Sequence, residues 1–173
     1  MDKTVPTIIV VILTLIALAA MYAGWRALRR RQADLPRPKP VPDDVGPALH
    51  SWDLLYVGTT AAGDPYARIA IDGLAFRGKA KVAVTARGII LAVTGEPDAF
   101  IPVEDLRTVS RATWAIDRAV EPGGLVAIGW TLSDDRKQNT DVDTYLRVVE
   151  PPDPTALIEA IAGLIPVANE REQ

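Results

Sequence analysis

Two short segments of this chain carry residue types that could do chemistry, and the first is GLAFRGK at residues 73–79. Its glycine and lysine spacing is that of a phosphate-binding P-loop, in which backbone N–H groups surround the phosphates and a following hydroxyl residue holds magnesium. Ala80 stands where that hydroxyl residue should be, and residues 82–85 continue as a strand where a helix should begin. We therefore expect a turn with a basic residue here and no nucleotide site.

The second segment is acidic and contains Asp134, Asp135, Asp141 and Asp143. A twelve-residue calcium loop needs a central glycine and a terminal bidentate glutamate, and neither is present. We expect a solvated hairpin tip.

His50 is the only histidine, and the chain has no cysteine. A zinc site would therefore rest on one histidine and carboxylates, which is an unusual ligand set. No nucleophile or orienting partner for a general base can be identified either. We expect an exposed His50, no catalytic, cofactor or metal residues, and no enzymatic activity.

Basic side chains gather around one predicted strand, and these are Arg77, Lys79, Lys81 and Arg87. Strand alternation places Lys79 and Lys81 on one face. They form either a solvated outer face or a candidate patch for an anionic lipid or peptide. Residues 43–173 carry twelve Lys and Arg against twenty Asp and Glu, a net charge of −8. An acidic domain is a poor partner for nucleic acid, so we expect none.

The segment from Val5 to Trp25 is uncharged and mostly apolar. About 21 helical residues span roughly 30 Å, the thickness of a bilayer's hydrocarbon core. A cleavable signal peptide is the alternative, because Ala17-Leu18-Ala19 fits a cleavage site, but its apolar core would be shorter. A buried core helix would show a polar face, and none is present. We expect a retained single transmembrane helix, with residues 1–31 comprising this helix and its basic flank.

Charge predicts the orientation of this helix. The predicted membrane-interface residues are Trp25, Arg26, Arg29, Arg30 and Arg31, and they follow the apolar segment at once. The more basic flank of a membrane helix faces the cytoplasm, and such a flank attracts anionic headgroups without specificity. We expect the inner (plasma) membrane, with the N-terminus outside and the C-terminal part in the cytoplasm.

Proline marks the next segment, residues 32–47, which we expect to be a semi-rigid linker. Residues 48–166 suffice for one domain, and residues 167–173 are expected to be a disordered tail. The domain contains short Val-, Ile- and Thr-rich segments between turn signals, which favours an antiparallel barrel or sandwich. The expected strands are 51–59, 66–71, 79–85, 89–94, 99–103, 106–116, 124–132 and 140–149.

The last expected strand alternates most clearly. Thr140, Val142, Thr144, Leu146 and Val148 fall on the core face, while Asp141, Asp143, Tyr145 and Arg147 fall on the wet face. Their cross-strand neighbours should include Val126, Ile128, Trp130 or Leu132. Trp52, Trp114 and Trp130 should be core or barrel-end residues.

A helical period then predicts one amphipathic helix over about residues 153–165. Asp153 is a suitable N-cap, Pro154 suits the first helical position, and Pro166 ends the helix. Its apolar stripe consists of Leu157, Ile158, Ile161, Leu164 and Ile165.

About seven strands followed by one helix resemble the pleckstrin-homology (PH) superfold. The closest local resemblance is to bacterial PH-like domains, through the strand pair at residues 81–91, the segment FIPVEDL at 100–106 and the strand at Val109. With its N-terminal helix, the chain looks like single-pass PH-like membrane proteins of actinobacteria. The resemblance implies a mainly β fold: a transmembrane helix plus an antiparallel β-barrel of about seven strands, closed by a C-terminal α-helix. In eukaryotic PH domains, basic residues around the first strand loop hold lipid headgroups, which makes the Arg77–Arg87 cluster a candidate.

These features lead to a hypothesis of a membrane-tethered, non-enzymatic PH-like interaction or adaptor domain, bound to the bilayer through its helix and to an unidentified protein partner. The alternative is an accessory subunit of a membrane transport or export system. A small ligand-binding or enzymatic barrel is a third class, and it would require a polar-lined cavity.

Overall fold

The computed structural model describes residues 4–32, 35–112, 114–115, 118–119, 125–133, 139–149 and 154–165. The predictions on Asp134, Asp135, Asp153, Pro166 and the tail at 167–173 lie outside these residues. The side chains of Trp25, Arg29, Arg30, Arg31 and Trp114 also lie outside the described part. The chain forms two compact units, residues 1–35 and 36–173.

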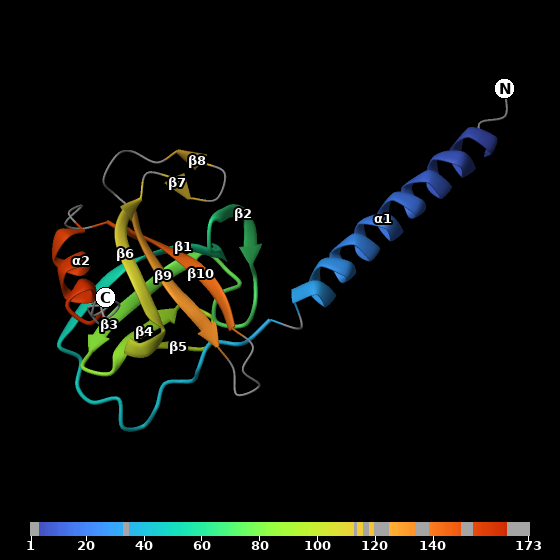
Figure 1. Cartoon of the computed structure of the whole chain (residues 1–173). Coiled ribbons are helices and arrows are strands. Elements are labelled where there is room, and N and C mark those ends of the chain that lie inside the picture. The colour runs from blue at the N-terminus through green and yellow to red at the C-terminus, as the bar shows by residue number, and fades with distance from the viewer. Residues whose placement is uncertain are drawn as a thin grey trace, which may run out of the picture. The chain divides into compact units, whose positions relative to one another are not determined.

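The first unit is the single helix α1 (Thr4–Gln32) (Figure 1). Its residues 7–24 are long and apolar enough to span a membrane, a property that a signal sequence near an N-terminus shares. The hydroxyl of Thr14 donates a hydrogen bond to the carbonyl of Val10 at 2.9 Å. The Thr14 hydroxyl is thereby satisfied by the backbone of its own helix.

The second unit is built on one antiparallel sheet. Its strands are β1 (His50–Ala61), β2 (Asp64–Ile69), β3 (Gly78–Thr85), β4 (Gly88–Val93), β5 (Ala99–Pro102), β6 (Leu106–Ala112), β9 (Leu125–Ser133) and β10 (Asn139–Val148). They lie in the order β5-β4-β3-β1-β10-β9-β6, with β2 paired to β1. The short strands β7 (Trp114–Ala115) and β8 (Arg118–Ala119) pair separately.

The folded unit is mainly β, as predicted. Its sheet is not closed as a barrel, so that part of the prediction is wrong. The two terminal strands of the order, β5 and β6, are joined through the 3-10 helix η1 (Val103–Asp105) and do not pair with each other. The free edge of β5 is occupied instead by Lys39, whose carbonyl accepts a 2.9 Å hydrogen bond from the Phe100 N–H. This contact covers part of the edge of the four-residue strand β5.

The register of β10 with β9 confirms the predicted neighbours. Val142 pairs with Trp130, Thr144 with Ile128 and Leu146 with Val126. Trp130 is fully buried, as predicted. Tyr145 is an exception, because it is buried on the face predicted to be wet. It forms a small cluster there with the buried Leu125, and the partly buried Val57, Ala112 and Ala127 pack against these two residues.

The terminal helix α2 (Thr155–Ala162) is confirmed, with a shorter extent than predicted. Pro154 precedes the first helical residue and is not itself helical. Leu157 and Ile161 are buried, and α2 packs on β6, where the guanidinium of Arg111 donates a hydrogen bond to the hydroxyl of Thr155.

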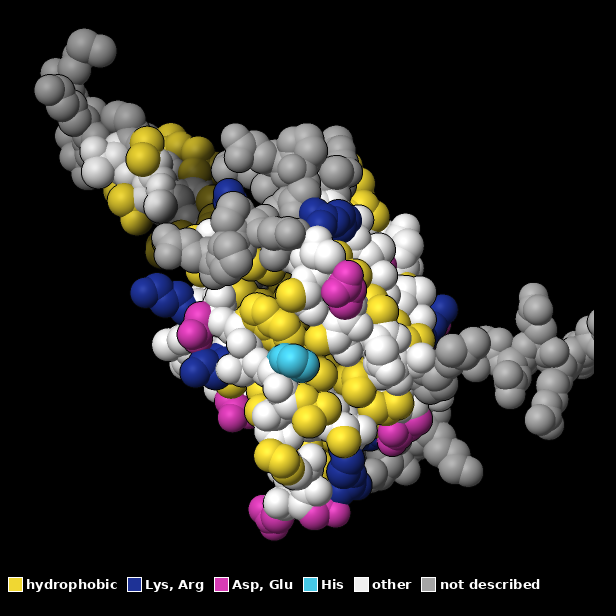
Figure 2. Space-filling model, turned by 90° about the vertical axis from the view of Figure 1, so that its left-hand side faces the viewer, with side chains coloured by type: hydrophobic (Ala, Val, Ile, Leu, Met, Phe, Trp, Pro, Cys, Tyr) yellow, Lys and Arg dark blue, Asp and Glu magenta, His cyan; other side chains and the backbone are white. Residues whose placement is uncertain are grey.

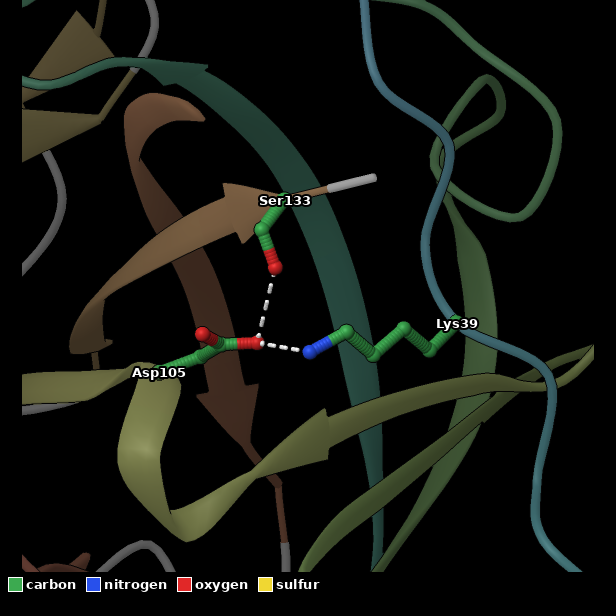
Figure 3. Close-up of polar contacts among 3 residues, drawn as sticks. All are labelled: Lys39, Asp105 and Ser133. Carbon is green, nitrogen blue, oxygen red and sulfur yellow. Dashed lines mark hydrogen bonds and ion pairs between the residues drawn. The ribbon is translucent and has the colours of Figure 1, made fainter. Parts of the chain in front are cut away.

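The predicted linker is not a free spacer from Pro36 onward. The ammonium of Lys39 lies 2.8 Å from Oδ2 of Asp105, and the hydroxyl of Ser133 donates to the same oxygen at 3.2 Å (Figure 3). One carboxylate in η1 thus joins the linker to the end of β9. Its side chain is only 13% exposed, so water screens this ion pair weakly.

Lys39→Ala should therefore lower the free energy of unfolding of residues 36–166 by about 1–2 kcal/mol. This is the low end of the range for a hydrogen bond to a charged group, about 1.5–3 kcal/mol, because the Lys39 side chain itself is 39% exposed. Arg37→Ala is the matched control, because Arg37 pairs with Asp72 at 3.4 Å while both side chains are largely exposed. That pair should contribute less than about 0.5 kcal/mol. Urea denaturation checks both variants, and equal effects would contradict the assigned role of Asp105.

Candidate functional site

The four basic residues predicted as an anionic-ligand patch do not converge on one place. Lys79 and Lys81 are exposed on the same face of β3, as alternation required. Arg77 lies just before this strand, whereas Arg87 follows its other end in the turn before β4. Seven residue steps at roughly 3.3 Å separate the two ends of β3 by about 23 Å. A single headgroup cannot contact all four side chains.

Two of these cations are also paired with carboxylates. Lys81 lies 3.7 Å from the carboxylate of Asp53, its direct cross-strand neighbour on β1. Arg87 forms an ion pair with the carboxylate of Asp44 and donates to the Asp44 carbonyl at 3.2 Å. Among the described residues, Arg77 and Lys79 have no ion-pair partner, so the patch reduces to these two and stays a prediction.

The P-loop-like string forms a turn followed by a strand, as predicted. Gly73 has a φ of 86°, which favours glycine, and β3 begins at Gly78. The backbone N–H of Gly73 already donates to the carboxylate of Glu96 at 2.9 Å. A phosphate at this position would have to displace a like-charged group, so the turn is not a phosphate cradle.

His50 is exposed, as predicted, and its ring lies against Trp52 with centroids 5.7 Å apart. Figure 2 shows the single histidine bordered by hydrophobic side chains. Within the described ranges, no group of three or more His, Cys, Asp or Glu residues could hold a metal ion.

A chain of buried hydrogen bonds runs through the core, and sequence reasoning missed it. The indole N–H of Trp130 donates to the hydroxyl of Thr144 at 2.9 Å. The Thr144 and Thr59 hydroxyls lie 2.8 Å apart, and Thr59 and Tyr56 2.9 Å apart. Tyr56 ends the chain by donating to the carbonyl of Leu74 at 2.9 Å.

The proton direction in this chain is fixed by its two ends. Trp130 can only donate, and the Leu74 carbonyl can only accept. Each hydroxyl between them has one proton, so Thr144 donates to Thr59 and Thr59 donates to Tyr56. The only sequence signal was the placement of Thr144 on the core face, because a buried hydroxyl needs a partner.

Burial raises the pKa of Tyr56 to about 12 from the ordinary value of 10.0, and the hydrogen bond from Thr59 opposes this shift less strongly. The phenol is therefore neutral at physiological pH and acts as a donor. Its arrangement supports the fold and gives no general base.

The raised pKa of Tyr56 also predicts alkaline instability. Because the fold favours the protonated phenol, its contribution is complete below about pH 10 and is lost as the pH rises towards 12, by up to about 3 kcal/mol. Urea unfolding between about pH 9 and 12 should show this loss. Tyr56→Phe should be less stable at neutral pH by about 1–3 kcal/mol, since Thr59 and the Leu74 carbonyl lose their partner. Its alkaline loss should be smaller. The exposed Tyr66→Phe serves as the control, and an identical alkaline profile for Tyr56→Phe would contradict the assignment.

The predicted membrane-interface residues all lie in the last turns of α1, after the apolar window 7–24. Of their side chains, the structure describes only that of Arg26, which is exposed. Their role at a membrane surface stays a prediction.

The topology defines the class of domain. A meander of β1, β3, β4 and β5 joins a second meander of β6, β9 and β10 through the β1–β10 pair, and a C-terminal helix packs on β6. This is a PH-like arrangement. Residues 33–162 match the family model described as Bacterial PH domain-like, and the chain belongs to that family. The match begins inside the predicted linker, in agreement with the contacts of Lys39. The comparison with curated proteins finds no match.

Proposed function

We propose that this protein is a membrane-tethered, non-enzymatic PH-like interaction domain. In this proposal α1 crosses the inner membrane once, the N-terminus lies outside, and the domain works in the cytoplasm. The main support for this proposal is the order of segments along the chain. An uncharged helix over residues 7–24 is followed by Arg26 and then by a family match beginning at residue 33.

Two further observations favour binding over chemistry. PH-like domains are generally non-enzymatic. In addition, the hydroxyls of Tyr56, Thr59 and Thr144 are buried and occupied by one another, so they are not presented to a substrate.

The partner is proposed to be an extended protein segment. Within the described residues β6 pairs only with β9, so its second edge carries backbone groups that another strand can pair with. The tether adds to such binding, because it raises the effective concentration of the domain for partners at the same membrane. The narrower resemblance to actinobacterial single-pass proteins also stays a prediction.

The decisive experiment determines the membrane topology. Because the chain has no cysteine, a single introduced cysteine is the only site that a maleimide can label. Asp2→Cys and Ala86→Cys variants are exposed to a membrane-impermeant maleimide on intact spheroplasts and again after lysis. We expect labelling of Asp2→Cys in both samples and of Ala86→Cys only after lysis. Labelling of Ala86→Cys from outside, or a mature chain that begins near Ala20, would leave an exported domain as the better account.

A pull-down from mildly solubilised membranes tests the interaction role. Recovery of soluble or single-pass proteins by the folded unit would support the adaptor. Stoichiometric recovery of a multi-pass transporter would favour an accessory subunit instead.

A further inference from the structure

Two aromatic side chains of the folded unit are strongly exposed to solvent. Tyr66 and Phe76 are each 69% exposed. The other large hydrophobic residues of that unit with high exposure, within its described part, are Leu49 at 57% and Val149 at 48%. Exposed aromatic rings are unfavourable in water and are enriched where a protein meets a membrane interface.

The two rings belong to one surface. Tyr66 and Arg68 are both exposed on β2 and, two residues apart, point to the same side. The guanidinium of Arg68 donates to the carbonyl of Ala75 at 3.1 Å, and Phe76 and Arg77 follow Ala75 directly. We call Tyr66, Arg68, Phe76 and Arg77 the aromatic edge. It combines two rings with two cations.

The chain enters the folded unit beside this edge. Arg37 pairs with Asp72 at 3.4 Å, and a Cβ built on Gly73 would lie 3.8 Å from Pro38. Residues 37 and 38 therefore contact the loop that carries Phe76 three residues further on. In Figure 1 the entering segment and β2 lie on the same side of the folded unit.

Covalent geometry keeps this entry point close to α1. Pro36 follows the last helical residue, Gln32, by four residues, which span at most about 14 Å. The helix itself rises about 12 Å between Gly24, where the apolar window ends, and Gln32. The aromatic edge is thus held within a few tens of ångströms of any bilayer that α1 crosses.

We propose that the aromatic edge rests on the surface of the bilayer that holds α1, with Tyr66 and Phe76 at headgroup level and Arg68 and Arg77 facing lipid phosphates. This inference rests on the proposed function, since it requires α1 to span the membrane. The two cations of the edge contrast with the net charge of the domain. Residues 43–173 carry a net charge of −8, so most of the domain is repelled by anionic lipid. Two carboxylates near the edge already have partners: that of Asp72 pairs with Arg37, and that of Glu96 accepts a hydrogen bond from the Gly73 N–H.

Single-cysteine spin labels on the full-length chain test this contact. Tyr66→Cys, Phe76→Cys, Leu49→Cys and Ile16→Cys are each labelled with a nitroxide and reconstituted into vesicles of phosphatidylcholine with phosphatidylglycerol. Collisions with oxygen, which partitions into lipid, are compared with collisions with a water-soluble nickel chelate. Leu49 is the matched control, because its N–H bonds to Val84 at the far end of β3 from Arg77. Thermal melting confirms that each labelled protein is folded.

We expect the nickel chelate to reach the labels at 66 and 76 several-fold less than the label at 49. Arg77→Gln, or added salt, should weaken this protection, and pure phosphatidylcholine should reduce it. Nickel access at 66 and 76 equal to that at 49, with Ile16 shielded in lipid, overturns the inference alone. A water-accessible label at Ile16 overturns the proposed tether itself. Dipolar broadening between labels at 76 would show that a second copy covers the edge, and this too contradicts a lipid contact.

Discussion

Gly88→Ala should destabilise the folded unit by about 2–5 kcal/mol, combining backbone strain with overpacking. Gly88 opens β4 with a φ of 152°, a conformation that L side chains rarely adopt. A Cβ at this position would lie 2.2 Å from the carbonyl oxygen of Ile101 on β5. Because the obstacle is backbone in a paired strand, the clash can be relieved only by shifting β4 and β5 apart.

Gly95→Ala is the matched control for this change. Gly95 has a φ of 89° with no atom within 4 Å of a built Cβ, so alanine there meets backbone strain without a clash. Its cost should be about 1–2 kcal/mol. Urea denaturation of both variants separates the two effects. Similar costs would show that β4 and β5 do not approach as closely as described.

Leu157→Ala and Ile161→Ala should each cost about 2–5 kcal/mol, the range for deleting a fully buried aliphatic side chain. Leu157 is 1% exposed and Ile161 is fully buried. Alanine is the better helix former, so a loss cannot come from helix propensity and must come from the emptied core. The double variant should approach the entire stability of a small domain, about 5–15 kcal/mol.

The exposed Glu159→Ala, on the same helix, should change stability by less than about 0.5 kcal/mol. Thermal melting of all four variants provides the check. A monomeric double variant that melts at the original temperature would mean that α2 does not complete the core.

Local periodicity predicted the eight longer strands to within a few residues, because alternation indicates which side of a strand is buried. It did not predict that β6 ends at Ala112 or that β7 and β8 form a separate pair. The set of neighbours on β9 followed from the shared core face, whereas the pairing of Val142 with Trp130 is known only from the structure. Closure of the barrel could not be predicted this way. It depends on whether the outer edges of β5 and β6 pair with each other, and alternation within a strand carries no information about that. Instead, Lys39 pairs with the β5 edge.

The same limit applies to candidate sites. Alternation placed Lys79 and Lys81 on one face but could not show that Asp53 lies opposite Lys81 or that Asp44 pairs with Arg87. Tyr66 and Phe76 gave no signal, because a single aromatic residue in a strand or loop is usually buried. Only the tertiary structure shows that these two are exposed.

The loop that carries Phe76 is anchored at its centre. Leu74 is fully buried, its N–H bonds to the Ile71 carbonyl at 2.9 Å, and its own carbonyl receives the Tyr56 hydroxyl. Phe76 therefore extends from a fixed point two residues away. Because the loop backbone is already ordered at Leu74, less conformational entropy is lost when Phe76 meets a surface.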